Sequence, residues 1–273
     1  MSSRNLDVYI IETPLSQRSA PLIKLLSSEP RINLVRISAK MVASDRDILD
    51  FGIKVNYKVF PLLEGRLLSH GEIGCAHSHN EARSLLAESM NGGVILEDDA
   101  RILDLDSLIK ISTDFLNQNK NSKRILSLTG MSQITPVNKN KYDSRNNKWV
   151  RTYGHSPLAV ANVMTPMAAG DLLNSNQPIK YVADWPYSKS KFYSVKVPIV
   201  YHGDETTESL IDASGSRTRV TKRRLLFFVY SFLGYLTTWN KQLGVRQYLN
   251  WIVVLPFLHR INTFLFAIRK IST

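Results

Sequence analysis

The stretch that decides the fold is VILEDDA, residues 94–100. Val94 to Leu96 are apolar, and Gly92-Gly93 breaks the chain just before them, so the segment up to Glu97 predicts a short buried strand. The strand runs straight into Asp98-Asp99. In an open α/β sheet, ligands bind beyond the carboxyl ends of the strands. The sequence therefore places three consecutive carboxylates at an edge where a ligand would bind.

The segments around this strand predict an α/β fold. The chain opens with a strand at 6–11, a helix at 19–28 and a strand at 33–37, and this β-α-β order favours a parallel sheet covered by helices. A polar, basic segment at 133–149 predicts a mobile loop. The remaining pattern predicts helices at 45–51, 71–89, 105–117 and 167–173, strands at 124–130 and 195–201, and an apolar segment at 158–163.

Three adjacent carboxylates repel one another, and burying them without compensation is costly. A hard divalent cation removes that repulsion, and Mg²⁺ or Mn²⁺ prefers one or two carboxylates together with phosphate oxygens. Alternate residues of an extended segment point the same way, so Glu97 and Asp99 are expected to share a side while Asp98 faces elsewhere. The competing interpretation is an acidic turn that caps the helix after it.

Two blocks together, GEIGCAHSH (71–79) and VILEDDA (94–100), resemble the paired signature of glycosyltransferase family 25, the bacterial lipooligosaccharide and lipopolysaccharide sugar transferases. The likeness covers about 200 residues, from near 7 to near 211. The chain departs from the family pattern at Glu12-Thr13 and at SAKMVAS (38–44). Further blocks recur in the family's order: VYII ending at Ile11, then Arg18, SLTG (127–130), Tyr153-Gly154, VADWP (182–186), Pro198 and ESLI (208–211).

The resemblance implies a GT-A-like fold, an α/β sandwich that binds a nucleotide sugar and has a mainly parallel sheet. It implies that Asp99, with Glu97 or Asp98, holds Mn²⁺ (or Mg²⁺) against the pyrophosphate of a UDP-sugar. It also implies that Ile11 in the opening strand, Arg18 and Asp98 contribute to donor binding. The implied reaction is the transfer of galactose or glucose to a lipid-linked oligosaccharide acceptor with inversion.

Inversion needs a general base for the acceptor hydroxyl, and Asp184 in VADWP is the first candidate. Glu72 is the second, and a late histidine, His202, is a candidate metal ligand. Each has a structural alternative: Asp184 as a turn cap, Glu72 as a helix cap, and His202 as a loop residue that only forms hydrogen bonds. We expect His79 to order the neighbouring site, and Cys75 to be a small packing residue.

The charge of the chain is concentrated at its end. The sequence has 35 basic and 23 acidic residues and a net charge of +12, yet no Asp or Glu follows Asp212. We therefore expect a catalytic domain at 1–212 and a basic, aromatic-rich helical tail at 213–273. The cations of this tail are Arg217, Arg219, Lys222, Arg223, Arg224, Lys241, Arg246, Arg260, Arg269 and Lys270.

The tail interleaves these cations with apolar, aromatic stretches at 225–239 and 249–259, a pattern typical of helices that lie on an anionic membrane surface. Packing on the catalytic domain or a dimer interface is the alternative. With one cysteine and no apolar signal segment at its start, the chain is expected to be cytoplasmic and peripheral on the inner face of the cytoplasmic membrane.

Two other functions share these features. The basic tail fits a nucleic-acid-binding arm, but its apolar runs are too long and uncharged for a solvated groove, so no nucleic-acid partner is expected. The acidic motif would also serve a metal-dependent phosphotransferase or hydrolase.

Overall fold

The computed structural model describes residues 5–14, 17–60, 66–130, 148–152, 159–184 and 188–203. All of these residues belong to one of the two units into which the chain divides. The helices are α1 (Ala20–Ser27), α2 (Asp45–Asp50), α4 (His70–Glu88), α5 (Leu105–Asn119) and α6 (Pro166–Ser175). The strands are β1 (Leu6–Glu12), β2 (Ile32–Ser38), β3 (Gly93–Glu97), β4 (Ala100–Ile102), β5 (Arg124–Ser127), β6 (Trp149–Arg151), β7 (Ala161–Met164), β8 (Lys191–Val195) and β9 (Val200–His202).

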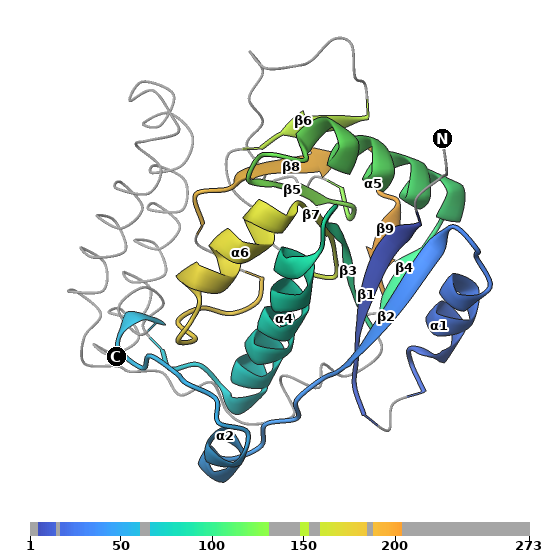
Figure 1. The fold of residues 1–273 in the computed structure, drawn as a ribbon. Coiled ribbons are helices and arrows are strands. Elements are labelled where there is room, and N and C mark those ends of the chain that lie inside the picture. Colours follow the sequence, from blue (N-terminus) through green and yellow to red (C-terminus); the bar gives the residue numbers. More distant parts are fainter. Residues whose placement is uncertain are drawn as a thin grey trace, which may run out of the picture. The chain divides into compact units, whose positions relative to one another are not determined.

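The main sheet has the strand order β2-β1-β3-β7-β5-β8-β6, and β4 pairs with β9 in a separate two-stranded sheet (Figure 1). The pairs β1–β2, β1–β3 and β5–β8 are parallel, whereas β3–β7, β5–β7 and β6–β8 are antiparallel. The predicted α/β class is confirmed. The expected parallel pairing holds for β2-β1-β3 and for β5–β8, whereas β7 and β6 pair antiparallel with their neighbours, because a buried apolar strand carries no local signal of its direction.

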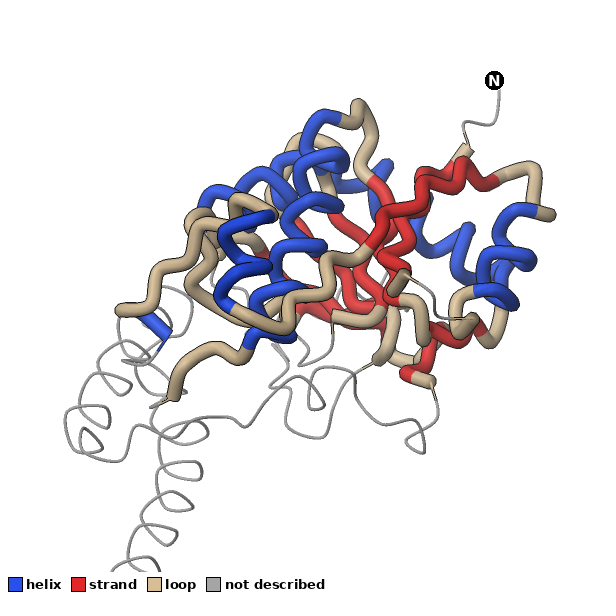
Figure 2. Tube along the Cα trace, turned by 90° about the horizontal axis from the view of Figure 1, so that it is seen from below, coloured by secondary structure: helices blue, strands red, loops and turns tan. Residues whose placement is uncertain are grey.

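Helices cover both faces of this sheet. Along β1, Val8 and Ile10 pack in an apolar cluster with α1 and α5, while Tyr9 and Ile11 pack in a second cluster with α4 and α6. This alternation is the period of two expected of an extended strand with both faces buried. Helices α4 and α6 lie side by side on the second face (Figures 1 and 2).

The predicted helices and the first three strands are confirmed to within a few residues. The expected strand at 195–201 is wrong, because the structure has two strands in different sheets, β8 ending at Val195 and β9 beginning at Val200. Pro198 lies between them and cannot donate a backbone hydrogen bond to a strand ladder. The strand predicted at 124–130 ends at Ser127, and the apolar segment at 158–163 contributes β7.

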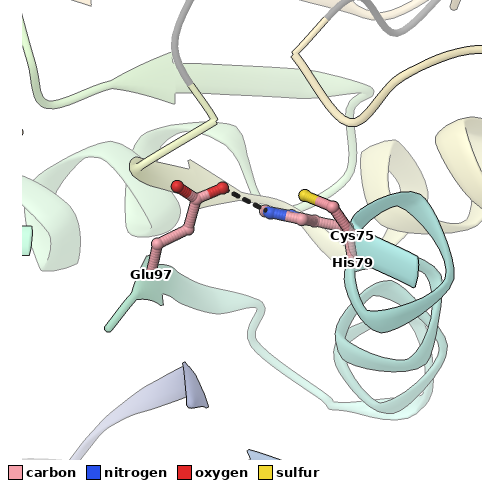
Figure 3. Close-up of side chains that lie close together, drawn as sticks. All are labelled: Cys75, His79 and Glu97. Atoms are coloured by element: carbon pink, nitrogen blue, oxygen red, sulfur yellow. Dashed lines mark hydrogen bonds and ion pairs between the residues drawn. The ribbon is translucent and has the colours of Figure 1, made fainter. Parts of the chain in front are cut away.

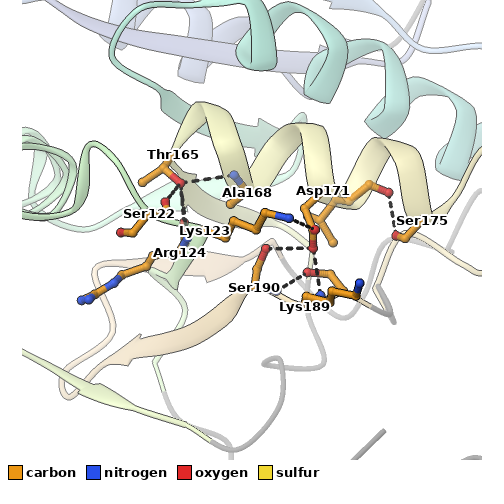
Figure 4. Close-up of polar contacts among 11 residues, drawn as sticks. Ser122, Lys123, Arg124, Thr165, Ala168, Asp171, Ser175, Lys189 and Ser190 are labelled. Carbon is orange, nitrogen blue, oxygen red and sulfur yellow. Dashed lines mark hydrogen bonds and ion pairs between the residues drawn. The ribbon is translucent and has the colours of Figure 1, made fainter. Parts of the chain in front are cut away.

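Side-chain hydrogen bonds tie α6 to the strands beside it (Figure 4). Thr165 caps the helix by accepting the Ala168 N–H, and its hydroxyl donates to the Ser122 carbonyl at 2.6 Å. Asp171 accepts hydrogen bonds from Lys123 Nζ and from the Lys189 N–H at 2.8 Å. These contacts fix α6 against β5 and β8, and α6 in turn packs against α4.

In the part of the chain that the structure describes, no helix is long and apolar enough to cross a membrane. The predicted tail at 213–273 lies outside the described residues. So does most of the loop predicted at 133–149, of which Trp149 begins β6.

Candidate active site

The carboxyl ends of β1 and β3 lie next to each other, since the two strands are parallel and Ile11 is in register with Glu97. The Thr13 N–H donates a hydrogen bond to Asp98 Oδ2 at 3.2 Å, so the buried Asp98 carboxylate joins the segments that follow the two strands. Ile11 itself is buried in the core, where its side chain packs with α4 and α6. The expected donor-binding roles of Ile11 and Asp98 stay predictions, and the contacts described here are structural.

The small β4–β9 sheet brings His202 to Asp99. Ala100 pairs with His202, and His202 Nε2 lies 3.2 Å from Asp99 Oδ2. The residue after His202 is Gly203, where a Cβ atom would lie 2.8 Å from the Asp99 carbonyl oxygen. Glycine is therefore required for β9 to approach Asp99 this closely.

Arg18 approaches the same carboxylate from the loop before α1. Its Nη2 lies 3.0 Å from Asp99 Oδ2, and both side chains are partly buried. The other oxygen, Asp99 Oδ1, is buried and has no hydrogen-bond partner among the described residues. A buried carboxylate oxygen without a partner is costly, and a bound cation would satisfy it. The donor set therefore fits the divalent metal that the sequence predicts.

Glu97 faces helix α4 and accepts or donates one short hydrogen bond there. His79 Nε2 lies 2.8 Å from Glu97 Oε1 (Figure 3). Burial, together with the negative charge of Asp99, raises the pKa of Glu97 to about 8. Burial, together with the positive charge of Arg83, lowers the pKa of His79 to about 3, so the imidazole is neutral at physiological pH. With Glu97 protonated and His79 neutral, this pair carries no charge at physiological pH, and a cation bound beside Glu97 would favour its ionised form.

Close packing at the start of α4 fixes the helix that carries His79. Ser69 and Glu72 form a reciprocal capping box at its N-terminus. One turn further on, a Cβ atom at Gly74 would lie 2.3 Å from the Lys40 carbonyl oxygen, so the helix passes directly against this backbone. Ser78 accepts the Lys40 N–H at 3.0 Å and donates to the Gly74 carbonyl, which gives it a structural role.

Glu72 has the capping role that the sequence offered as its alternative. Its carboxylate accepts the Ser69 N–H at 2.9 Å, and Arg66 contacts both carboxylate oxygens at 2.7 and 2.6 Å. A carboxylate with both oxygens bound in a buried ion pair is poorly placed to accept a proton from a substrate. The contacts of Glu72 are therefore those of a helix cap, and Asp184 stays the first candidate for the base.

Asp184 lies within electrostatic reach of Glu97, His79 and His202. Burial, followed by the charge of Glu97, raises the pKa of Asp184 to about 6, although the Ala159 N–H donates to its Oδ1 at 2.8 Å and opposes the rise. The structure therefore brings Asp184, far along the chain, to the group formed by Glu97, Asp99 and His202.

Sequence reasoning assigned no role to Arg83 and only a packing role to Cys75, yet both lie at this site. Arg83 is fully buried on α4 and donates to the Ala183 carbonyl at 3.3 Å, next to Asp184. Cys75 and His79 present their ligand atoms to Glu97, and the three atoms lie within 4.8 Å of one another. The four-residue spacing of Cys75 and His79 on a predicted helix was a usable signal for a shared face. Nothing local signals that Arg83 is buried.

An α/β sheet with grouped carboxylates, imidazoles and an arginine at one strand edge is typical of enzymes that bind phosphorylated ligands with a metal. The sequence model of glycosyltransferase family 25, described as LPS biosynthesis protein, matches residues 43–186. The match covers more than half of the chain and includes α4, β3 and Asp184. The chain belongs to this family, and it is therefore a glycosyltransferase of lipopolysaccharide biosynthesis. None of the curated proteins compared with the chain matched it.

Proposed function

We propose that the protein transfers a hexose, galactose or glucose, from a UDP-sugar to a lipooligosaccharide or lipopolysaccharide core acceptor, with the help of Mn²⁺ or Mg²⁺ and with inversion. The observation that carries this proposal is the state of Asp99. One of its oxygens contacts Arg18 and His202, and the other is buried without a hydrogen-bond partner in the described part of the chain. A cation and a phosphorylated donor together would complete this arrangement.

In this proposal Glu97, Asp99 and His202 hold the metal. Two carboxylates and one imidazole suit Mn²⁺ and leave coordination positions for phosphate oxygens. The bound metal supplies Lewis-acid stabilisation of the charge on the leaving nucleoside diphosphate. Arg18 binds the diphosphate, since a guanidinium donates to phosphate as it does to the Asp99 carboxylate. Asp98 keeps the two strand ends together through Thr13.

Asp184 acts as the general base in this proposal. Its raised pKa is suited to accepting a proton near neutral pH, and the ionised form takes the proton of the acceptor hydroxyl during attack on the sugar. The hydrogen bond from Ala159 to Oδ1 holds the carboxylate in orientation. Arg83 positions the segment by binding the Ala183 carbonyl.

The finer parts of the proposal rest on the sequence. A GT-A-like fold for residues 1–212 follows from the resemblance and from the α/β sheet. Membrane association of residues 213–273, on the inner face of the cytoplasmic membrane, follows from their cations and aromatics. Such a location places the enzyme beside a lipid-linked acceptor. Family membership favours sugar transfer over the phosphotransferase or hydrolase alternative.

The test is product analysis with the full chain, Mn²⁺, a panel of UDP-sugars and truncated lipooligosaccharide acceptors. Mass spectrometry is expected to show one added hexose, and NMR to show the anomeric configuration inverted from the donor. Retention of configuration, or phosphate release without sugar transfer, would contradict the proposal. Liposome flotation of the full chain and of a chain ending at 212 tests the membrane part separately.

A further inference from the structure

Two side chains beside the proposed active site have no part in the proposed reaction, although both point at Glu97 (Figure 3). Cys75 and His79 lie four residues apart on one face of α4, and Glu97 ends β3 opposite them. The sulfur, the imidazole nitrogen and the carboxylate oxygen all lie within 4.8 Å of one another. We propose that Cys75, His79 and Glu97 form a second, thiolate-containing site for a zinc-type divalent cation.

The donor types argue for this class of cation. Thiolate, imidazole and carboxylate are the ligands that Zn²⁺ takes in proteins, whereas Mg²⁺ and Mn²⁺ prefer oxygen ligands. Three protein ligands leave one position of a tetrahedral site for water or another small ligand. The cation at this site therefore differs in kind from the one proposed for Glu97, Asp99 and His202.

The distances are close to what such a cation needs. Metal–ligand distances of roughly 2.0–2.3 Å in a tetrahedral site place neighbouring ligand atoms about 3.3–3.6 Å apart. His79 and Glu97 are already 2.8 Å apart, and the sulfur lies no more than 4.8 Å from either atom. The ligand atoms would therefore need only small shifts to reach the spacing of a tetrahedral site.

The scaffold of the site is fixed. Two of its ligands come from one helix, whose approach to the Lys40 backbone leaves no room for a side chain at Gly74. The hydrogen bonds of Ser78 to Lys40 and Gly74 hold the same turn of the helix. His79 is only 2% exposed, so its ring has little freedom to turn away. Ligands held on rigid elements lose little entropy when a metal binds.

This site and the Mn²⁺ site of the proposed function, on which this step rests, share Glu97. The two cations therefore compete for its carboxylate. A carboxylate that ligates a cation beside Cys75 and His79 is withdrawn from the Mn²⁺ site at Asp99 and His202. Zn²⁺ is therefore expected to inhibit sugar transfer, and added Mn²⁺ to relieve the inhibition.

Cobalt(II) is the probe for the site, because thiolate-bound Co²⁺ has a charge-transfer band in the near ultraviolet. Cys75 is the single cysteine of the chain, so any such band reports on it alone. Titration of the full-length protein is expected to give this band at one Co²⁺ per chain. Cys75→Ser is expected to abolish the band, and His79→Gln to weaken Co²⁺ binding by at least ~10-fold.

Two variants serve as controls. His77→Gln, on the same helix, removes an imidazole that faces Glu81, and it is expected to leave the cobalt spectrum unchanged. Asp99→Asn removes the proposed Mn²⁺ ligand and is also expected to keep the band. Circular dichroism and thermal unfolding confirm that each variant is folded. Absence of the band in the wild type, or unchanged Co²⁺ affinity in folded His79→Gln, would overturn the proposal.

An activity measurement separates this site from the proposed reaction. Zn²⁺ is expected to inhibit the wild type in competition with Mn²⁺, and Cys75→Ser is expected to keep Mn²⁺-dependent transfer while losing sensitivity to Zn²⁺. Zinc inhibition that persists at full strength in Cys75→Ser would contradict the proposal. If no sugar is transferred at all, the proposed function fails while the cobalt spectra still decide the metal site.

Discussion

Arg18 and Asp99 are 81 residues apart in the chain, yet Arg18 Nη2 lies 3.0 Å from Asp99 Oδ2. The pair joins the loop after β1 to the turn after β3, at the edge where these parallel strands end. His202 reaches the same oxygen from β9. Three distant segments therefore meet at one carboxylate, and this meeting point is the centre of the proposed active site.

Replacing Arg18 by Gln is expected to weaken donor binding. A charge-assisted hydrogen bond contributes about 1.5–3 kcal/mol, so the KM for the UDP-sugar is expected to rise roughly 10- to 100-fold, with a smaller change in kcat. Steady-state kinetics over a range of donor concentrations measure both constants. Arg31→Gln is the matched control, because Arg31 forms an exposed ion pair with Asp106 away from the site. Equal effects of the two substitutions would remove Arg18 from donor binding.

Asp184→Asn is expected to lower kcat by about 10²- to 10⁴-fold while leaving the fold intact, because the amide oxygen still accepts the Ala159 N–H. A general base works in its ionised form. With the pKa of Asp184 raised to about 6, kcat/KM in the wild type is expected to fall about tenfold per unit as the pH drops below 6. A pH–rate profile checks this, and an acid limb that survives in Asp184→Asn would assign the titration to another group.

The stability of the metal-free protein is expected to fall as the pH rises from about 4.5 to about 8. Folding raises the pKa of Glu97 from 4.5 to about 8, so the folded state favours the protonated carboxyl. The resulting stabilisation is complete below about pH 4.5 and is lost as the pH passes 8, with a slope of at most about 1.4 kcal/mol per unit. Urea denaturation at several pH values in the presence of a chelator measures it. Glu97→Gln is expected to make stability less dependent on pH. Identical slopes for the wild type and Glu97→Gln would show that Glu97 does not cause the pH dependence.

Two glycines on neighbouring helices give opposite expectations for the same change. Gly74→Ala on α4 places a methyl group 2.3 Å from the Lys40 carbonyl oxygen and is expected to lower the free energy of unfolding by about 1–3 kcal/mol. In Gly170→Ala on α6, the added methyl group lies 3.8 Å from Ala87 Cβ, its nearest neighbour. This substitution is expected to raise the free energy of unfolding by about 0.5–1 kcal/mol. Both values come from denaturant unfolding. A stabilised Gly74→Ala protein would show that α4 can move away from Lys40.

Local patterns were sufficient for the helices, for the first three strands and for the acidic motif. The period of two in β1 and the capped, helix-like pattern of α4 are read directly from neighbouring residues. The alternation expected across Glu97, Asp98 and Asp99 stays a prediction, because β3 ends at Glu97 and the two aspartates form the turn after it. The confirmed features depend on interactions within a few residues.

Features that depend on distant pairing were not predictable in the same way. The contact of His202 with Asp99 follows from the antiparallel pairing of β4 with β9, about a hundred residues apart, and no local pattern sets that register. The burial of Arg83 contradicts its usual place on a helix surface, and it arises because the Ala183 carbonyl and Asp184 reach α4 from another segment. Cys75 likewise becomes a candidate metal ligand only because β3 places Glu97 beside it.

The central claim is that Asp99 holds the catalytic metal for sugar transfer, and Asp99→Asn tests it most directly. Wild-type transfer from the UDP-sugar is expected to require Mn²⁺ or Mg²⁺, and Asp99→Asn is expected to lower the rate by roughly 10²- to 10³-fold at saturating metal. Asp104→Asn is the matched control, because Asp104 caps α5 and Asn is an equally good cap. A folded Asp99→Asn protein that transfers sugar at the wild-type rate, with the same dependence on metal, would contradict the account.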